Sequence, residues 1–249
     1  MKQNIIAIIP ARMGSSRFYG KPMQKINGIP MIERIYKILS KVNVLKMVVV
    51  ATCDKEIFNH IKGIAGNVVM TKKSHTRASD RCAEAIEIVE KKEKLFFDIV
   101  IMVQGDEPMV TESMINSSIK PMLNDRSIQI SNLCTRIKNK KDFYDKNCVK
   151  VIFNKNMNAI YFSRSPIPFS NKKKFIGFKQ VCIIPFRRKF LDCYNKISPT
   201  FLEKTESVDM NRLIENDIKI KMIKIKKETF PVDTIKDLRR VKKIIKSGL

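Results

Sequence analysis

Short apolar runs recur through the first half of the chain and are separated by polar turns. The first run, residues 5–9, contains four isoleucines and ends at Pro10. Similar runs follow at residues 47–52, 68–70 and 98–104. Short continuous apolar runs that end at turn-forming residues are typical of strands buried on both faces of a parallel sheet.

Amphipathic segments lie between these runs. Residues 31–39 and 78–89 each carry apolar side chains at helical spacing, and Asp54 is placed to cap a helix that follows the second run. Thr234 and Asp237 form a Thr-x-x-Asp capping pattern that predicts the start of a last helix. We expect its apolar positions to face the core: Ile235, Leu238, Val241 and Ile245. Alternating strands and helices predict a layered α/β domain with a mostly parallel sheet.

The pattern changes from about residue 127. Strand candidates are separated there by irregular basic stretches: residues 127–134, 149–153, 180–185 and 220–225. This arrangement predicts a smaller antiparallel β extension, at about residues 127–226, inserted before the last helix of a single domain spanning residues 1–249.

Composition narrows the class of protein. The chain has no run of about 18 apolar residues and starts directly on a strand-like segment, so we expect a cytoplasmic protein with no membrane partner. The six cysteines form no Cys-x-x-Cys pair and there are only two histidines, which argues against a zinc cage or a disulfide framework.

The chain carries a formal charge of +25, mostly from lysine. A basic surface can bind nucleic acids or other polyanions. The lysines, however, occur in scattered pairs and triplets without interleaved aromatic residues, whereas recognition modules concentrate arginine and stacking aromatics. A solvated lysine-rich surface is the preferred interpretation, with nucleic acid not expected as a partner and polyanion binding left as the alternative.

A basic loop follows the first strand. It holds Arg12, Arg17 and Lys21, with Gly14 and two hydroxyls from Ser15–Ser16. Three cations and exposed backbone amides near a helix start can cradle a polyphosphate. The loop matches neither Gly-x-x-x-x-Gly-Lys-Ser/Thr nor Gly-x-Gly-x-x-Gly, so a surface loop with incidental charge stays the alternative.

Four motifs together resemble one enzyme family. They are Ile-Ile-Pro-Ala-Arg-Met-Gly-Ser-Ser-Arg-Phe-Tyr-Gly-Lys-Pro-Met at 8–23, Val-Gln-Gly-Asp-Glu-Pro at 103–108, Tyr-Phe-Ser-Arg at 161–164 and Val-Asp-Thr at 232–234. In this order they resemble the 3-deoxy-manno-octulosonate (Kdo) cytidylyltransferases, within the sugar-acid cytidylyltransferases. The resemblance implies a Rossmann-like, three-layer nucleotidyltransferase fold, CTP and a Kdo-like sugar acid as substrates, pyrophosphate as product, Mg²⁺ as cofactor, a role in lipopolysaccharide or surface glycan synthesis, and a homodimer.

The resemblance also assigns roles near the triphosphate. It implies that Asp106 and Asp233 bind Mg²⁺ and act in catalysis with Arg12 and Lys21, while Arg12, Arg17 and Lys21 bind the nucleotide. In-line attack on an α-phosphorus calls for cations and alignment, which suits these residues. We expect the two carboxylates to converge on one metal site. The alternatives are a turn residue for Asp106 and a helix-flanking anion for Asp233.

The resemblance points to Arg81, Gln104 and the backbone around Ala11 for cytosine, with a solvated helix cation as the alternative for Arg81.

For the sugar, the resemblance points to Arg164, Gln180 and Asp209. Here the chain departs from the family pattern, because Gln180 replaces a histidine, Ile184 a tyrosine, and Asp209–Met210 a Glu-Gln pair. Buried polar groups strongly affect substrate discrimination, so another sugar acid, sialate-like or amino-substituted, is the alternative substrate.

Overall fold

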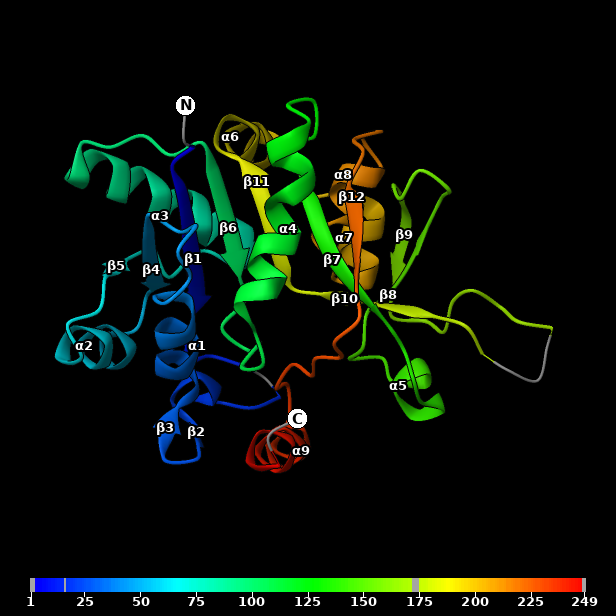
Figure 1. The fold of residues 1–249 in the computed structure, drawn as a ribbon, viewed down its shortest axis with the longest axis horizontal. Coiled ribbons are helices and arrows are strands. Elements are labelled where there is room, and N and C mark those ends of the chain that lie inside the picture. Colours follow the sequence, from blue (N-terminus) through cyan, green and yellow to red (C-terminus); the bar gives the residue numbers. More distant parts are fainter. Residues whose placement is uncertain (1–2, 16, 172–174, 248–249) are drawn as a thin grey trace. The chain divides into compact units, whose positions relative to one another are not determined.

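The computed structural model describes residues 3–15, 17–171 and 175–247. They form two compact units (Figure 1). Unit 1 comprises residues 1–115 and 229–249, and unit 2 comprises residues 116–228. The division falls within helix α4, Glu112–Asn124.

Unit 1 is built on parallel strands in the order β6-β1-β4-β5. Their bounds are β1 Ile5–Ala11, β4 Met47–Thr52, β5 Val68–Met70 and β6 Ile99–Val103. Every residue of β1 and β6 is buried, as expected for strands covered on both faces. The four predicted strands and the parallel α/β fold class are therefore confirmed.

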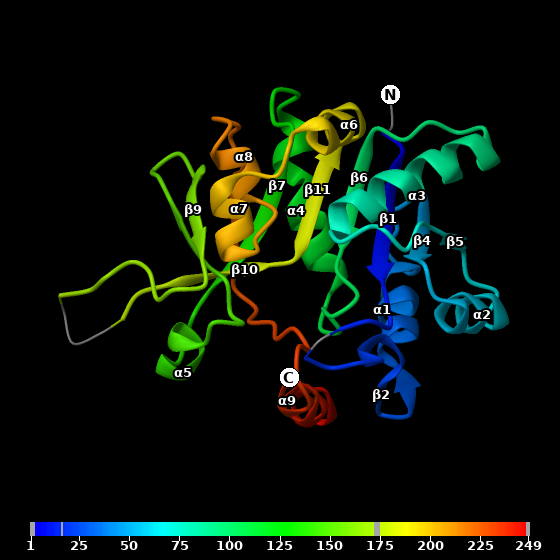
Figure 2. The same cartoon turned by 180° about the vertical axis from the view of Figure 1, so that it is seen from behind.

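Helices α1 Met31–Leu39, α2 Lys55–Gly63, α3 Ala78–Glu93 and α9 Ile235–Lys246 complete unit 1. Helix α3 packs on all four strands and is seen crossing them in Figure 2. A 3₁₀ turn, η1 Lys21–Met23, precedes a hairpin of β2 Lys25–Ile26 and β3 Ile29–Pro30. Asn27 and Gly28 both have positive φ at the tip of this hairpin, as a tight two-residue turn requires.

The local sequence patterns at two helix starts can be compared with the structure. The capping box of Thr234 and Asp237 is present as predicted. Asp54 does occupy the position before α2, but its side chain makes no capping hydrogen bond and instead accepts one from the backbone N–H of Met13. The prediction that Ile235 faces the core is wrong, because 55% of this residue is exposed, while Leu238 and Val241 are buried.

Unit 2 contains a five-stranded sheet in the order β12-β7-β10-β8-β9. The bounds are β7 Ser131–Arg136, β8 Lys150–Phe153, β9 Ala159–Ser163, β10 Phe178–Val181 and β12 Lys221–Ile225. Strand β12 pairs parallel to β7 and the other pairs are antiparallel, so the sheet is mixed rather than purely antiparallel.

Helices account for much of the irregular basic sequence of unit 2. They are α5 Lys140–Tyr144, α6 Arg188–Lys196, α7 Phe201–Glu206 and α8 Asn211–Ile214. Their shortness explains why periodicity did not reveal them, since four to nine residues make at most two or three turns. No helix in the described ranges is long and apolar enough to cross a membrane.

The strand predicted over residues 180–185 is broken at Cys182 into β10 and β11, Ile183–Arg187. The buried side chain of Asn132 donates to the carbonyl of Val181 at 2.8 Å and reaches that of Ile183 at 3.5 Å. This amide satisfies backbone groups that a continuous ladder would otherwise pair.

A buried ion pair joins α7 to α8. The Arg212 guanidinium meets both Glu203 carboxylate oxygens at 2.7 Å, and the two side chains are 3% and 0% exposed. The Glu203 carboxylate accepts these hydrogen bonds and so raises the pKa of Arg212 above its usual value. The two opposite charges compensate each other, and the negative charge of Asp209 adds to the attraction on Arg212.

Replacing Glu203 by glutamine should leave the buried guanidinium without its countercharge. We expect the free energy of unfolding to fall by about 3 kcal/mol in urea denaturation followed by circular dichroism. The control is Glu93→Gln, which breaks the exposed Lys92–Glu93 pair and should cost less than about 0.5 kcal/mol. Equal small losses in both variants would contradict the assignment of Glu203–Arg212 as a structural pair.

Candidate active site

The basic loop after β1 is anchored through Met13. Its N–H donates to Asp54 Oδ2 at 2.9 Å, and its carbonyl accepts from the Gly20 N–H at 2.9 Å. Gly20 has φ of +69°, which glycine adopts without strain. Arg12 and Arg17 are exposed on this loop, and Ser16, a predicted hydroxyl donor, lies outside the described residues.

Asp106 and Asp233 converge as the sequence predicted. The Lys21 ammonium lies 2.6 Å from Asp106 Oδ2 and 3.2 Å from Asp233 Oδ1. Arg17 Nη2 contacts the same Asp233 oxygen at 3.0 Å. Three segments that are far apart in the sequence thus meet through charged side chains in unit 1.

Backbone and buried side-chain bonds hold the two aspartates together. The N–H of Val232, which precedes Asp233, donates to the Asp106 carbonyl at 2.9 Å. One residue beyond Asp106, the buried Glu107 carboxylate accepts from the Thr229 hydroxyl at 3.0 Å. Sequence analysis missed both contacts, although Glu107 lies inside a motif it identified.

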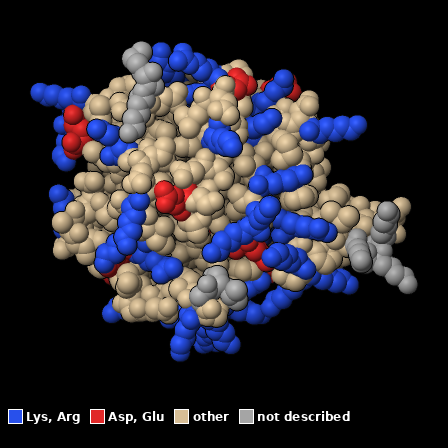
Figure 3. All heavy atoms as spheres, viewed as in Figure 1, with Lys and Arg blue, Asp and Glu red and all other residues tan. Residues whose placement is uncertain are grey.

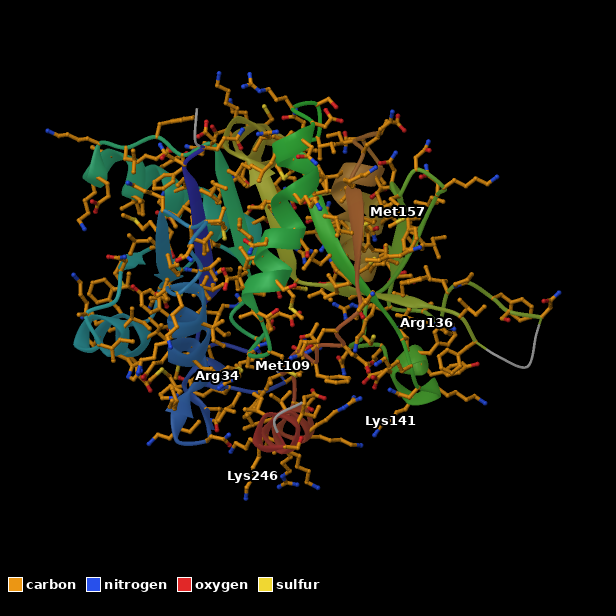
Figure 4. The ribbon with its side chains drawn as sticks, in the orientation of Figure 1. Arg34, Met109, Arg136, Lys141, Met157 and Lys246 are labelled. Atoms are coloured by element: carbon orange, nitrogen blue, oxygen red, sulfur yellow. The ribbon has the colours of Figure 1, made fainter. Side chains whose placement is uncertain are left out.

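The backbone at Gly105, just before Asp106, passes close to the backbone of β1. A Cβ added at Gly105 would lie 3.0 Å from the carbonyl oxygen of Pro10 in β1, so only glycine fits without displacing backbone. Further along the turn, Arg34 of α1 donates to the Pro108 carbonyl at 3.1 Å. Figure 4 labels Arg34 and the adjacent Met109. The loop after β6 is therefore tied to both β1 and α1.

The electrostatics of the site favour cations. Burial lowers the pKa of Lys21, but attraction to Asp106 and Asp233 outweighs it and holds the pKa above its usual value. Asp106 Oδ1 is buried and has no hydrogen-bond partner among the described residues. An anionic oxygen in that position is a ligand suited to a hard cation.

A divalent metal fits this donor set if substrate phosphates and water complete its coordination shell. The described part of the chain holds no cluster of three or more His, Cys, Asp and Glu side chains suited to a metal. Mg²⁺ commonly binds through one or two carboxylates and completes its shell with substrate phosphates and water. Asp106 and Asp233 provide the carboxylates for such a site.

Residues predicted to bind the nucleotide occupy different environments. Ala11 is the buried last residue of β1, and Gln104, directly after β6, is partly exposed. Arg81 is only 3% exposed and donates to the Thr71 hydroxyl and the His75 carbonyl. The alternative that Arg81 is a solvated helix cation is therefore wrong, because its guanidinium holds the loop that precedes α3.

Arg164 is engaged within unit 2. Its guanidinium donates to the backbone carbonyls of Glu206 at 2.7 Å, Lys146 at 2.9 Å and Ser207 at 3.2 Å. The fully buried Lys150 donates to the Arg164 carbonyl, and burial lowers the pKa of this lysine. The Arg164 guanidinium, predicted to bind the sugar carboxylate, is thus hydrogen-bonded to backbone carbonyls in this structure.

The other residues predicted to bind the sugar also have internal partners. Gln180 donates to Asn132 Oδ1 at 2.7 Å, and the Asp209 carbonyl accepts from the Tyr194 hydroxyl at 3.3 Å. Ile184, at the position where the family pattern has tyrosine, is buried. These contacts show how the substituted residues are accommodated within unit 2.

Glu206 is a polar centre that sequence analysis missed. Its carboxylate accepts from the Ser163 hydroxyl at 2.6 Å, the Arg164 N–H at 2.8 Å and the Tyr161 hydroxyl at 2.9 Å. Burial raises the pKa of Glu206, but these hydrogen bonds outweigh it and leave the pKa below its usual value. Three of the four residues of the Tyr-Phe-Ser-Arg motif therefore converge on one carboxylate.

Positive charge predominates on the face drawn in Figure 3. Lys and Arg side chains gather there in several groups, and Asp and Glu form small isolated groups. That this lysine-rich surface is solvated stays a prediction.

Comparison with known proteins agrees with the motifs. A family model described as cytidylyltransferase matches residues 6–222. The chain is 36% identical to the 3-deoxy-manno-octulosonate cytidylyltransferase of Trichlorobacter lovleyi, over 98% of this chain and 99% of that protein. It is 38% identical to the enzyme of the same name from Fusobacterium nucleatum, over 98% and 97%. The chain belongs to the 3-deoxy-manno-octulosonate cytidylyltransferases. The family predicted from the four motifs is thus confirmed.

Solved structures support the family fold. A CMP:2-keto-3-deoxy-manno-octonic acid synthetase complexed with CTP superposes with a TM-score of 0.88 at 33% identity, over 99% of this chain and 100% of that one. A 4-diphosphocytidyl-2C-methyl-D-erythritol synthase from Anaerococcus prevotii shares the fold alone, with a TM-score of 0.64 at 18% identity, over 98% of this chain and 97% of that one. The nucleotidyltransferase architecture of this cytidylyltransferase is therefore established.

A side chain at position 105 should disturb the active-site turn of the cytidylyltransferase. Gly105→Val would press against the Pro10 carbonyl, and we expect the free energy of unfolding in urea to fall by about 1–3 kcal/mol. Gly14→Val is the matched control, because no atom lies within 4 Å of a Cβ added there. Its change should stay within about 0.5 kcal/mol. Equal stability of the two variants would refute the close approach.

Proposed function

We propose that this cytidylyltransferase transfers CMP from CTP to Kdo, releasing pyrophosphate, for lipopolysaccharide or surface glycan synthesis. The observation that carries the proposal is the convergence of Asp106 and Asp233 beside the cationic loop of Arg17 and Lys21. Family membership and the likeness to a synthetase complexed with CTP support the choice of CTP and Kdo.

The reaction is an in-line displacement at the α-phosphorus of CTP. The anomeric hydroxyl of the sugar acid forms the new P–O bond and loses its proton, while the bond to the bridging α–β oxygen breaks and its electron pair leaves with pyrophosphate. Negative charge grows on the phosphoryl oxygens and on the leaving group. Cations and exact alignment therefore contribute more than a covalent nucleophile would.

Arg12, Arg17 and Lys21 supply the cations. Arg12 is exposed and forms no ion pair with the described residues, so its guanidinium is available to a phosphate. The Arg17 side chain is 43% exposed, and its guanidinium lies beside Asp233 in the same site. A planar guanidinium can bind phosphate through two hydrogen bonds, and the Lys21 ammonium adds a compact charge.

Asp106 and Asp233 would hold Mg²⁺. Bound there, the metal would neutralise phosphate charge and favour ionisation of the attacking hydroxyl. The buried Asp106 Oδ1, which has no hydrogen-bond partner in the described part of the chain, is the feature that best supports the assignment.

Gln104, the backbone of Ala11 and Arg81 are proposed to recognise cytosine. Gln104 follows β6 and Ala11 ends β1, and these two strands are neighbours in the parallel sheet. Ligands of such sheets bind at the carboxyl ends of the strands. An amide can both donate to and accept from the edge of a cytosine ring. Arg81 would contribute through the donors it does not use on Thr71 and His75.

Recognition of the sugar acid is proposed to involve Arg164, Gln180 and Asp209 in unit 2. To bind a carboxylate, Arg164 would have to exchange some of its three backbone carbonyl partners for the ligand. Because the chain differs from the family pattern at these positions, a sialate-like or amino-substituted acid is the second candidate substrate.

Homodimer formation and a cytoplasmic location stay predictions. Large apolar side chains exposed in unit 2 support a dimer, and they include Tyr144, Ile160, Phe169, Ile176 and Phe201. Phe169 is 91% exposed, and burial of such side chains against a second copy would be favourable.

Pyrophosphate release with CTP, Mg²⁺ and a panel of sugar acids tests the function. Activity with Kdo supports the proposed substrate, and activity only with another acid supports the second candidate. If no sugar acid turned over while the protein bound RNA or DNA tightly and in a salt-sensitive way, the polyanion-binding alternative would replace both.

Asp106→Asn and Asp233→Asn should each lower kcat by about 100-fold or more, and raise the Mg²⁺ concentration needed for half-maximal rate, because each loses a charged ligand. Steady-state pyrophosphate release at varied Mg²⁺ measures both effects. Glu56→Gln, an exposed change on α2, is the control and should leave the rate unchanged. An unaltered rate in either aspartate variant would remove that residue from the metal site.

A further inference from the structure

The Lys21 ammonium occupies the position between the two carboxylates of the proposed metal site. It lies 2.6 Å from Asp106 and 3.2 Å from Asp233, and it is the one cation that the described ion pairs join to both. Arg17 also contacts Asp233, at 3.0 Å. Two aspartates held this close repel each other unless a positive charge lies between them.

The same ammonium does not complete the site. Asp106 Oδ1 is buried and forms no hydrogen bond with residues 3–15, 17–171 or 175–247, although Oδ2 of the same carboxylate contacts Lys21. An ion that accepts both carboxylates as ligands could use this oxygen as well. Lysine thus compensates the charge while leaving one ligand oxygen unused.

The backbone on either side of Lys21 is fixed, so movement of the ammonium depends on the side chain alone. Gly20 before it is hydrogen-bonded to Met13, and Pro22 after it is buried. The lysine side chain is a flexible stem of four carbons that ends in a compact charge. The ammonium can therefore leave the carboxylates without any rearrangement of the loop.

We propose that Lys21 is a resident cation that competes with the metal: it neutralises Asp106 and Asp233 in the nucleotide-free protein, and the metal binds only when Lys21 moves away. The triphosphate of CTP gives the departing ammonium a new anionic partner, so CTP favours the exchange. Lys21 thereby couples metal binding to nucleotide binding. This inference rests on the metal site proposed above.

Competition makes a quantitative prediction for the nucleotide-free protein. If Lys21 occupies the site about nine-tenths of the time, the apparent affinity for metal falls about tenfold. Lys21→Met keeps much of the side-chain length and removes the ammonium. We expect this variant to bind Mn²⁺ about tenfold more tightly than wild type without CTP, measured by the electron paramagnetic resonance signal of free Mn²⁺.

Arg17→Met is the matched control. It removes the same charge from the same loop and from the same Asp233 oxygen, but from a side chain that is 43% exposed, whereas that of Lys21 is 16% exposed. We expect its Mn²⁺ affinity to rise by less than about threefold, since an ion pair made by an exposed side chain contributes little. Lys21→Gln, with its thermal unfolding compared to wild type, repeats the test should the methionine variant fold poorly.

The same titrations with CTP separate this inference from the proposed function. Wild-type protein should bind Mn²⁺ more tightly with CTP, and the ratio between the two conditions should shrink in Lys21→Met. One result refutes the competition alone: Lys21→Met binds Mn²⁺ no more tightly than wild type, or no more tightly than Arg17→Met. In that case wild-type protein still binds Mn²⁺ in a CTP-dependent way, and Asp106→Asn loses this binding. If Asp106→Asn leaves Mn²⁺ binding unchanged with and without CTP, the metal site itself is wrong and both proposals fall.

Discussion

The attraction between one ammonium and two carboxylates is the interaction on which the active site depends. Asp106 and Asp233 precede and follow the segment that forms unit 2, and two like charges would not stay close without compensation. Lys21 supplies the charge, and the hydrogen bond from Val232 N–H to the Asp106 carbonyl supplies the position. The distance between the two aspartates is therefore set by backbone geometry as well as by the attraction of their side chains to Lys21.

The parallel sheet provides the rigid base for this arrangement. Strands β1 and β6 are adjacent, so the loop holding Lys21 and the turn holding Asp106 leave the same edge of the sheet. Gly105 lets that turn pass against Pro10, and Asp54 holds Met13 at the start of the loop. Several of these supporting residues carry no chemistry themselves, yet they decide where the charged groups lie.

Unit 2 uses its polar residues differently. Arg164 donates to backbone carbonyls, and Gln180 donates to Asn132. Glu206 accepts from hydroxyl and amide groups of the Tyr-Phe-Ser-Arg motif. In unit 1 the charged groups face each other across a shared site, whereas in unit 2 Arg164 and Glu206 bind neighbouring backbone and hydroxyl groups. A motif can therefore mark a residue for family membership while its side chain performs a structural task.

The sequence by itself determined the strands of unit 1, the capping box at Thr234, the family and the identity of the converging aspartates, because short buried runs, caps and motifs are local signals. It did not determine that Asp54 would hold Met13, that Ile235 would be exposed, or that Arg81 would be buried against Thr71. Nor did it reveal the short helices of unit 2 or the role of Glu206. These features depend on partners many residues away, and only tertiary structure decides which donor meets which acceptor.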